Sequence, residues 1–212
     1  MIDNVYKGTV RKNLLTDLVY IHLAGRFQRV EDYPFKGSLP YIDIQTLETG
    51  NPLRYAEGKD YVLKEKDLVI VKDGHRSGKV FRAKEGIAAS TLTILTPRSP
   101  EAPMDYLYCY LAYCYEDFQS RVRGTTISHL DMNYLRQMII PLPEVDIQRE
   151  IAEKYQSIEN LVKEMKEKSA SLLHLSDKLE CRDLKDRCKS LSLQGDMTLK
   201  SWLHQVFGGE VV

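Results

Sequence analysis

The chain has 212 residues, which is long enough to bury a hydrophobic core without disulfides or metal ions. Lysine plus arginine and aspartate plus glutamate number 30 each, so the net charge gives no reason to expect a nucleic acid, a membrane or an acidic ligand. The four cysteines form no CxxC pair and are too sparse for a secreted disulfide scaffold, which favours free thiols in a reducing cytosol.

No stretch approaches the roughly 20 apolar residues that a membrane span needs. The N-terminal stretch MIDNVYKGTVRKNLL carries charges where a signal peptide needs an apolar segment. We therefore expect a cytoplasmic protein that does not bind membranes.

Short strand patterns dominate the first half of the chain. An apolar run at 14–24 fits either a strand or a helix. Apolar and polar side chains alternate over 41–47, which predicts a strand. The continuous apolar run from Leu68 to Val71 predicts a buried strand that enters a tight turn at Asp73-Gly74, and a further strand is predicted at 90–95. Several short strands separated by turns indicate a sheet-rich domain.

Helical patterns begin at Met104. From there, apolar side chains recur every three or four residues with tyrosines among them, which predicts a helix with an aromatic face. We expect this helix to end near Gly124, because glycine suits a helix C-terminus. Apolar residues over 130–138 predict a second, short helix, with Asp131 or Ser128 placed to cap its start.

The pattern changes at Pro141 and Pro143, after which the chain reads as long, charged helix. Proline ends the element before it and biases its neighbour toward an extended form. We therefore predict a domain boundary here, with a globular domain at 1–143 and a helical region at 144–212. The expected fold class is α+β, a sheet-rich domain followed by a long coiled-coil-forming helix and a short C-terminal helix.

Beyond the prolines, apolar side chains alternate spacings of seven with spacings of three and four, as in a coiled coil. We predict one helix from Asp146 to about Cys188, roughly 60 Å long at about 1.5 Å per residue. Residues 194–196 would separate it from a short helix at 197–207. A narrow apolar stripe on a polar helix is stable only against a partner helix, so we expect a homodimer. The predicted dimerisation residues are Ile151, Ile158, Leu161, Met165, Leu172, Leu175 and Leu179.

No motif indicates catalysis. The glycines of GHRSGKVF at 74–81 are spaced as GxxxG, and Val80 stands where a phosphate-binding loop needs serine or threonine. The sequence has no nucleophile elbow, metal-binding histidine pair or dinucleotide fingerprint, so we expect no catalytic residue, metal or cofactor. One alternative stays open, a Mg²⁺-dependent nuclease that uses Asp43, Glu57 and Lys59.

Basic side chains cluster on two predicted turns. Such side chains can neutralise phosphates, and arginine, histidine and serine can also reach base edges in the major groove. The alternative is that both turns are merely solvated. The first turn surrounds Asp73-Gly74 and carries Lys72, His75, Arg76, Lys79, Arg82 and Lys84, and the second carries Arg121, Arg123, Thr125 and Thr126.

The order of several segments resembles the DNA-specificity (S) subunits of type I restriction-modification systems, over about 37–210. The most specific segment is GTTISHLDMNYLRQMIIPLPEVDIQREIA at 124–152, which is similar to the family's passage from a target recognition domain to a spacer helix. The other matching segments are GSLPYIDI at 37–44, KDLVIVKDGHRSGKV at 66–80, EGIAASTLTIL at 85–95, YLYCYL at 106–111 and LKSWLHQVFGGEV at 199–211.

This resemblance implies a role in DNA recognition without catalysis. Members of the family read half of a bipartite DNA site with each recognition domain, and long helices fix the distance between the halves. Methylation of adenine N6 belongs to a methyltransferase (M) subunit and cleavage to an endonuclease (R) subunit.

A full S subunit has two recognition domains and two helices, whereas this chain has one of each. The resemblance therefore implies a half subunit that pairs antiparallel with a second copy, or else a fragment of a longer protein. The alternative from another class is a coiled-coil adaptor that binds protein. The predicted DNA contacts are Lys72, His75, Arg76 and Lys79 on the first turn and Arg123, Thr125, Thr126 and His129 on the second.

Overall fold

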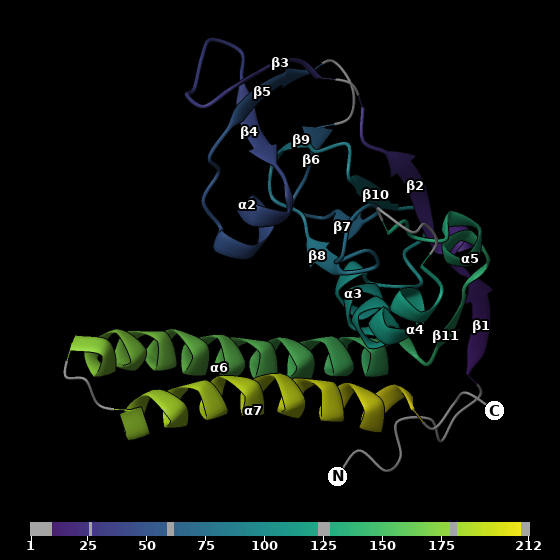
Figure 1. Ribbon diagram of the computed structural model, residues 1–212. Helices are drawn as coiled ribbons and strands as arrows, with labels where there is room; N and C mark the ends of the chain where they lie inside the picture. Colours follow the sequence, from purple (N-terminus) through teal and green to yellow (C-terminus); the bar gives the residue numbers. More distant parts are fainter. Residues whose placement is uncertain (1–9, 26, 59–61, 123–127, 179–181, 209–212) are drawn as a thin grey trace.

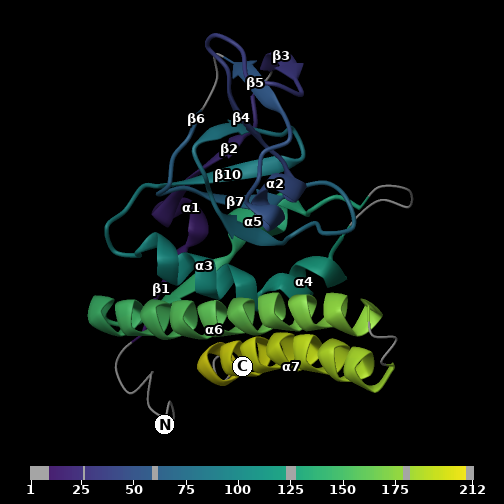
Figure 2. The same cartoon turned by 90° about the vertical axis from the view of Figure 1, so that its left-hand side faces the viewer.

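The structure is a computed structural model that describes residues 10–25, 27–58, 62–122, 128–178 and 182–208. A sheet-rich part, which we call the head (residues 10–142), lies on one side of two long helices, which we call the helical hairpin (residues 145–207) (Figure 1). The view turned by 90° also places both helices beneath the head (Figure 2). The expected α+β fold is confirmed. In the described ranges, no helix is long and apolar enough to cross a membrane.

The head contains short strands and short helices, and the hairpin contains two long helices. In chain order the elements of the head are β1 (Arg11–Leu14), α1 (Leu15–Leu18), β2 (Val19–Leu23), β3 (Phe27–Glu31), β4 (Leu39–Ile42), α2 (Ile44–Thr49), β5 (Tyr55–Gly58), β6 (Val62–Leu63), β7 (Leu68–Val71), β8 (Val80–Arg82), β9 (Gly86–Ala88), β10 (Leu92–Pro97), α3 (Met104–Tyr113), α4 (Tyr115–Ser120), α5 (Met132–Gln137) and β11 (Ile139–Leu142). The hairpin consists of α6 (Val145–Lys178) and α7 (Arg182–Phe207).

Within the described ranges, the strands form two sheets and one two-stranded ribbon. The first sheet has the order β2-β10-β7-β8 and is antiparallel throughout. The second has the order β3-β5-β4-β9-β6, in which β4 and β9 run parallel. In the ribbon, β1 pairs antiparallel with β11 and Leu14 lies opposite Ile139. The first and last strands of the head are therefore neighbours.

Strand β7 explains the apolar run that the sequence contains. All of its residues are buried. Leu68 and Ile70 pack into a core shared with the helices, whereas Val69 and Val71 pack into a second core shared with the other sheet. Because successive side chains of a strand point to opposite faces, a strand covered on both faces must be apolar at every position. The predicted buried strand is confirmed.

The larger core continues from the head into the hairpin. Tyr106 on α3 is fully buried, and its ring centroid lies 6.1 Å from that of Phe207 at the end of α7. Tyr110 meets the same phenylalanine edge-on at 5.2 Å. Ile151 and Tyr155 join this core from α6. Secondary structure thus changes at the predicted boundary while the core runs across it, and the division into two domains stays a prediction.

The segment predicted as a strand at 41–47 is a strand only in its first part. From Ile44 it becomes α2, because Asp43 caps that helix by accepting a hydrogen bond from the backbone N–H of Thr46 at 2.8 Å. Gly50 ends α2 with φ 79°, a left-handed conformation that favours glycine. Local capping chemistry therefore overrides the alternating pattern.

The helices after Met104 follow the prediction with one interruption. The long aromatic helix is divided at Cys114 into α3 and α4. The short helix and its cap are confirmed, because the Asp131 carboxylate accepts hydrogen bonds from the backbone N–H groups of Asn133 and Tyr134 at 3.0 and 3.1 Å.

The prediction of one uninterrupted helix to Cys188 is wrong. Helix α6 ends at Lys178, and α7 packs against it in the reverse direction, so α6 finds a partner helix inside its own chain. Gly195 does not break the second helix but lies within it, where an added Cβ would approach Val162 Cγ1 to 3.2 Å. A glycine inside a helix costs only about 1 kcal/mol, and here it permits close helix packing.

The predicted dimerisation residues divide between two environments. Ile151 is 2% exposed and packs in the core, so it is not available to a second copy. Leu161, Met165 and Leu172 are 61%, 39% and 41% exposed, although α7 packs against another face of the same helix. We call these three residues the α6 stripe. Of the others, Ile158 is half-buried, and the Leu175 side chain and Leu179 lie outside the described residues.

Candidate nucleic-acid interface

The first turn that the sequence singles out lies beside residues 128–130, which follow the second turn in the chain. The backbone N–H of Gly74 donates to the Ser128 carbonyl at 2.8 Å, and that of Leu130 donates to the Lys72 carbonyl at 2.8 Å. Asp73 and His129 face each other in an antiparallel bridge between these two bonds. We call residues 72–79 and 128–130 the loop cluster. The predicted contacts Arg123, Thr125 and Thr126 lie outside the described residues.

Glycines and one serine determine the shape of the first loop. Gly74 and Gly78 have φ of 104° and 89°, and a Cβ on Gly78 would lie 2.4 Å from that of Phe118. The backbone N–H of Gly78 donates to the Val71 carbonyl at 2.8 Å, which closes the loop at the end of β7. The Ser77 hydroxyl lies 3.0 Å from the carbonyl oxygens of both loops, those of Lys72 and Ser128.

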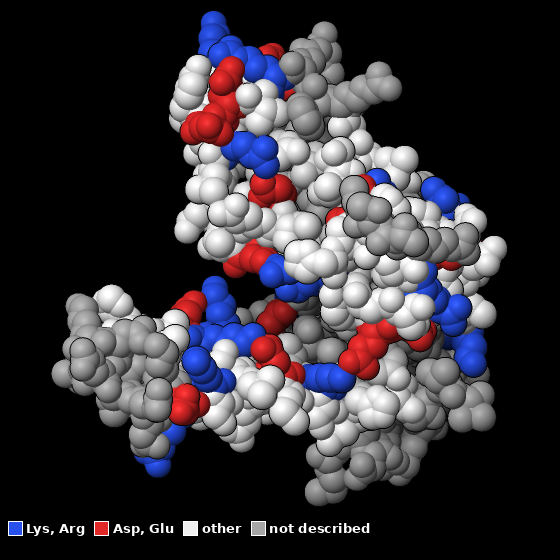
Figure 3. Space-filling view, viewed as in Figure 1, with Lys and Arg blue, Asp and Glu red and all other residues white. Residues whose placement is uncertain are grey.

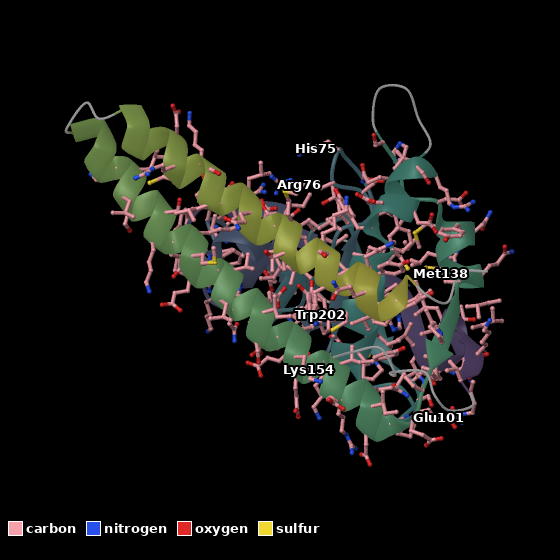
Figure 4. All side chains as sticks on the ribbon, turned by 90° about the horizontal axis from the view of Figure 1, so that it is seen from below. His75, Arg76, Glu101, Met138, Lys154 and Trp202 are labelled. Carbon is pink, nitrogen blue, oxygen red and sulfur yellow. The ribbon has the colours of Figure 1, made fainter. Side chains whose placement is uncertain are left out.

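Acidic neighbours compensate part of the positive charge of the first loop. Lys72 forms an ion pair with Asp73, and Arg76 forms one with Glu48 on α2. Glu48 also lies 3.0 Å from the Nζ atom of Lys79. These pairs hold the basic side chains in place, but an incoming phosphate would have to compete with them. Figure 4 shows His75 and Arg76 next to each other.

His129 and Asp73 form a hydrogen bond from one loop to the other. Nδ1 of His129 lies 2.7 Å from Oδ1 of Asp73, and the two side chains are 54% and 20% exposed. Burial works against ionisation of Asp73, but hydrogen bonds from Lys72 and His129 outweigh it and lower the pKa of that carboxyl. Asp73 is therefore an anion at neutral pH, and it orients an exposed imidazole.

Arg82, although close in sequence to the first loop, is directed toward the hairpin. Its Nε donates to Asp105 on α3 at 2.9 Å, and its Nη1 donates to Glu159 on α6 at 2.8 Å. The guanidinium stacks on the Tyr108 ring at 3.9 Å, and the Tyr108 hydroxyl donates to Glu159 at 2.5 Å. We call these four residues the joint cluster. Arg82 and Glu159 lie 77 residues apart in the chain, so the spacing of residues in the sequence could not predict the joint cluster.

The joint cluster favours charged Arg82 and a neutral Tyr108. Burial works against the Arg82 charge, but Asp105 and Glu159 outweigh it and raise the pKa of that guanidinium. Burial, together with the negative charge of Glu159, raises the pKa of Tyr108, so its hydroxyl stays protonated and donates. Arg82 is thus occupied by structural contacts and is not a candidate for binding DNA.

A cleft of about 1010 Å³ lies between one part of the underside of the head and the hairpin (Figure 3). Lys79 and Lys84 line it from the head, and Lys163 and Lys166 line it from α6. Acidic side chains accompany them on both walls, so the cleft does not present the single sign of charge that a polyanion needs. These acidic residues are Glu48, Glu116, Glu159, Glu167 and Asp196.

Lys79 is shared between the loop cluster and this cleft. Burial lowers its pKa, and the positive charges of Arg76 and Lys166 lower it further. Lys79 is therefore a weaker candidate for phosphate contact than its position in the sequence indicated.

The nuclease alternative finds no support. The Asp43 carboxylate caps α2 and accepts a hydrogen bond from Arg54 at 2.8 Å, while Lys59 lies outside the described residues. Burial works against ionisation of Asp43, but these hydrogen bonds outweigh it and lower its pKa. Within the part of the chain that the structure describes, no group of three His, Cys, Asp or Glu side chains could hold a metal ion.

Comparisons with known proteins agree on one family. Residues 10–174 match the family described as type I restriction modification DNA specificity domain. The specificity subunit of the type I restriction enzyme MjaVIII from Methanocaldococcus jannaschii is 28% identical over 133 residues, which is 62% of this chain and 31% of that protein. The chain therefore spans about a third of the length of this curated relative.

Two solved structures have a similar fold. The S subunit of a type I restriction-modification system from M. genitalium superposes with a TM-score of 0.56 at 20% identity, over 81% of this chain and 43% of that one. The HsdS subunit from Thermoanaerobacter tengcongensis superposes with a TM-score of 0.55 at 17% identity, over 95% of this chain and 45% of that one.

Proposed function

Because the chain belongs to the family of type I restriction modification DNA specificity domains, we propose that it recognises a short DNA sequence for a type I restriction-modification system. The observation that carries this proposal is the family match over 10–174, which includes the whole head and most of α6. In this proposal residues 1–143 are the target recognition domain, and residues 144–212 are the spacer and dimerisation region.

The loop cluster is the surface of the head that we assign to DNA. It presents cations for phosphates and an oriented imidazole for base edges, which are the two kinds of contact that sequence recognition needs. The residues are Lys72, His75, Arg76, Lys79 and His129, together with Arg123, Thr125 and Thr126 from the adjoining segment.

Catalysis belongs to partner subunits in this proposal. The chain directs an adenine-N6 methyltransferase (M) subunit to its site and, within a complete system, an endonuclease (R) subunit. It supplies DNA recognition and no catalytic group of its own.

We further propose that two copies pair through the α6 stripes of their hairpins to form the specificity unit. The chain covers 43% and 45% of the two solved subunits, so two copies supply nearly the length of one of them. The α6 stripe supports pairing, because its side chains remain exposed after α7 has packed. A dimer with two-fold symmetry would read two identical half sites in opposite orientation.

Sequencing of methylated adenines tests the recognition function. The chain is co-expressed with its M subunit, and the methylated motif is compared with that of the M subunit alone. We expect a split, palindromic motif only when the chain is present. An unchanged methylation pattern would contradict the proposal.

Light scattering tests the pairing. Leu161→Lys and Leu172→Lys together should convert a dimer into a monomer, because they place charges within an apolar contact. The matched control is Leu193→Lys on α7, a leucine that is 63% exposed and lies outside the α6 stripe. A wild-type chain that stays monomeric at high concentration, or a dimer that the double variant leaves intact, would argue against pairing through α6.

A further inference from the structure

His129 is held more firmly than an exposed loop histidine usually is. The backbone of His129 forms an antiparallel bridge with that of Asp73. A backbone hydrogen bond of 2.8 Å joins the two loops on each side of this bridge. Its ring is then fixed by Asp73 at 2.7 Å, and Asp73 is itself held by Lys72. Both the position and the orientation of the imidazole are set before any ligand arrives.

The partner of Nδ1 determines what Nε2 can do. An ionised carboxylate has only acceptor atoms, so the hydrogen of a neutral His129 must lie on Nδ1. Nε2 is then a hydrogen-bond acceptor. Among the residues that the structure describes, none makes a hydrogen bond to Nε2, and the side chain is 54% exposed. The loop cluster thus presents a single oriented acceptor to an incoming molecule.

An acceptor with this orientation does not suit a phosphate. Phosphate oxygens need donors, and the neighbouring Asp73 carboxylate would repel them. In the major groove, by contrast, adenine N6 and cytosine N4 are donors, whereas guanine and thymine present acceptors at the corresponding positions. The chemistry of Nε2 therefore matches an amino group on a base.

Resting on the proposed function, we propose that His129 is a specificity-determining residue whose Nε2 accepts a hydrogen bond from adenine N6 or cytosine N4 at one position of the half site. Asp73 is the positioning residue of His129. It holds the hydrogen on Nδ1 and so determines which bases can donate a hydrogen bond to Nε2.

His75 provides an internal contrast on the same loop. Nε of Arg76 donates to Nε2 of His75 at 3.2 Å, so the hydrogen of a neutral His75 lies on Nδ1 and the ring offers a donor. The two histidines thus present opposite hydrogen-bonding character. The control for His129→Ala is His174→Ala, an exposed histidine on α6 that lies outside the loop cluster.

The experiment uses the full chain in complex with its M subunit. Methylated-adenine sequencing identifies the wild-type half site, and competition binding with duplexes that differ at one base pair measures discrimination at each position. For His129→Ala we expect one adenine or cytosine position to become degenerate, with discrimination there falling about fivefold or more. Spacing and all other positions should be retained.

Asp73→Asn sharpens the test because an amide can donate to Nδ1 and thereby place the hydrogen on Nε2. We expect the preference at that same position to weaken or to shift toward guanine or thymine, while His174→Ala leaves it unchanged. An unaltered motif in His129→Ala overturns the inference. So does a wild-type guanine or thymine at the affected position, or a loss of preference there in His174→Ala.

Failure of this inference differs from failure of the proposed function. If wild-type chain directs methylation but His129→Ala leaves the motif intact, the inference alone is wrong. If wild-type chain adds no motif to that of the M subunit, the proposed function is wrong. Thermal unfolding of each variant checks its folding, and the exposed position of His129 leads us to expect a melting temperature close to that of wild type.

Discussion

The loop cluster and the joint cluster contain the same kinds of polar residues in opposite surroundings. In the loop cluster, Asp73 is satisfied by neighbours while His129 is 54% exposed. In the joint cluster, Arg82 and Glu159 are 28% and 27% exposed, and each contacts at least two other groups. The first cluster therefore leaves an atom available for a ligand, whereas the second uses its atoms to hold the head on α6.

Basic residues that are close together in the sequence therefore need not form one basic surface. Lys72, Arg76 and Arg82 stand within one short stretch, but β8 directs Arg82 toward the hairpin. Substitutions in the joint cluster should therefore change the stability of the chain and the placement of the head, without changing the bases recognised. Substitution of the exposed His129 should instead change the bases recognised with little change in stability.

The largest effect is expected from Phe207→Ala. This substitution removes an aromatic side chain that packs α7 against α3 of the head. Phe207 is 1% exposed and contacts the rings of Tyr106, Tyr110 and Tyr113. We expect the free energy of unfolding to fall by about 4 kcal/mol, measured by urea denaturation. Leu193→Ala is the control and should change it by less than about 0.5 kcal/mol. Similar losses for both variants would mean that α7 does not contribute to the core.

Glu159→Ala should have the next largest effect and lower the free energy of unfolding by about 2 kcal/mol. The substitution leaves the Arg82 guanidinium and the Tyr108 hydroxyl without their shared acceptor, and partial exposure of the pair moderates the loss. Glu150→Ala, which breaks an exposed pair with Lys154 on the same helix, is the control at about 0.3 kcal/mol. The methylated motif should keep its bases. A changed base preference would show that the two clusters are not separable.

Asp131→Ala should cost about 1 kcal/mol, because it removes the cap of α5 next to the loop cluster. Asn133→Ala, at an exposed position of the same helix, should change stability by less than about 0.5 kcal/mol. Chemical denaturation measures both. If the two variants lose equal stability, the cap contributes nothing.

The smallest effect concerns acid sensitivity. The pKa of Asp73 in the folded chain lies below its ordinary value of 3.8, so its ionised form contributes stability above that value and loses it as the pH falls through the folded pKa. Asp73→Asn should therefore lose less stability than wild type between pH 7 and about pH 3, as followed by circular dichroism during urea denaturation. Asp146→Asn, whose side chain is 94% exposed, is the control. An unchanged acid response in Asp73→Asn would contradict this assignment.

Local chemistry could be predicted from the sequence, but long-range contacts could not. The buried run at Leu68–Val71 and the cap at Asp131 depend on neighbouring residues, and both are confirmed. The pairing of Asp73 with His129, 56 residues away, requires the whole head to fold and has no periodic signal. The predicted helix break at Gly195 was wrong for the same reason, because the role of this glycine depends on Val162 of the facing helix.

The ribbon of β1 and β11 brings the two ends of the head together, so the segment between these strands could be exchanged as one unit. Because the chain enters and leaves the head on two hydrogen-bonded strands, another domain could be inserted between Leu14 and Ile139 without moving the first turn of α6. The replacement would need its own apolar helix in the place of α3, since Tyr106 and Tyr110 bind the head to α7. Exchange of the segment between these strands would replace the loop cluster and leave α6 and α7 unchanged.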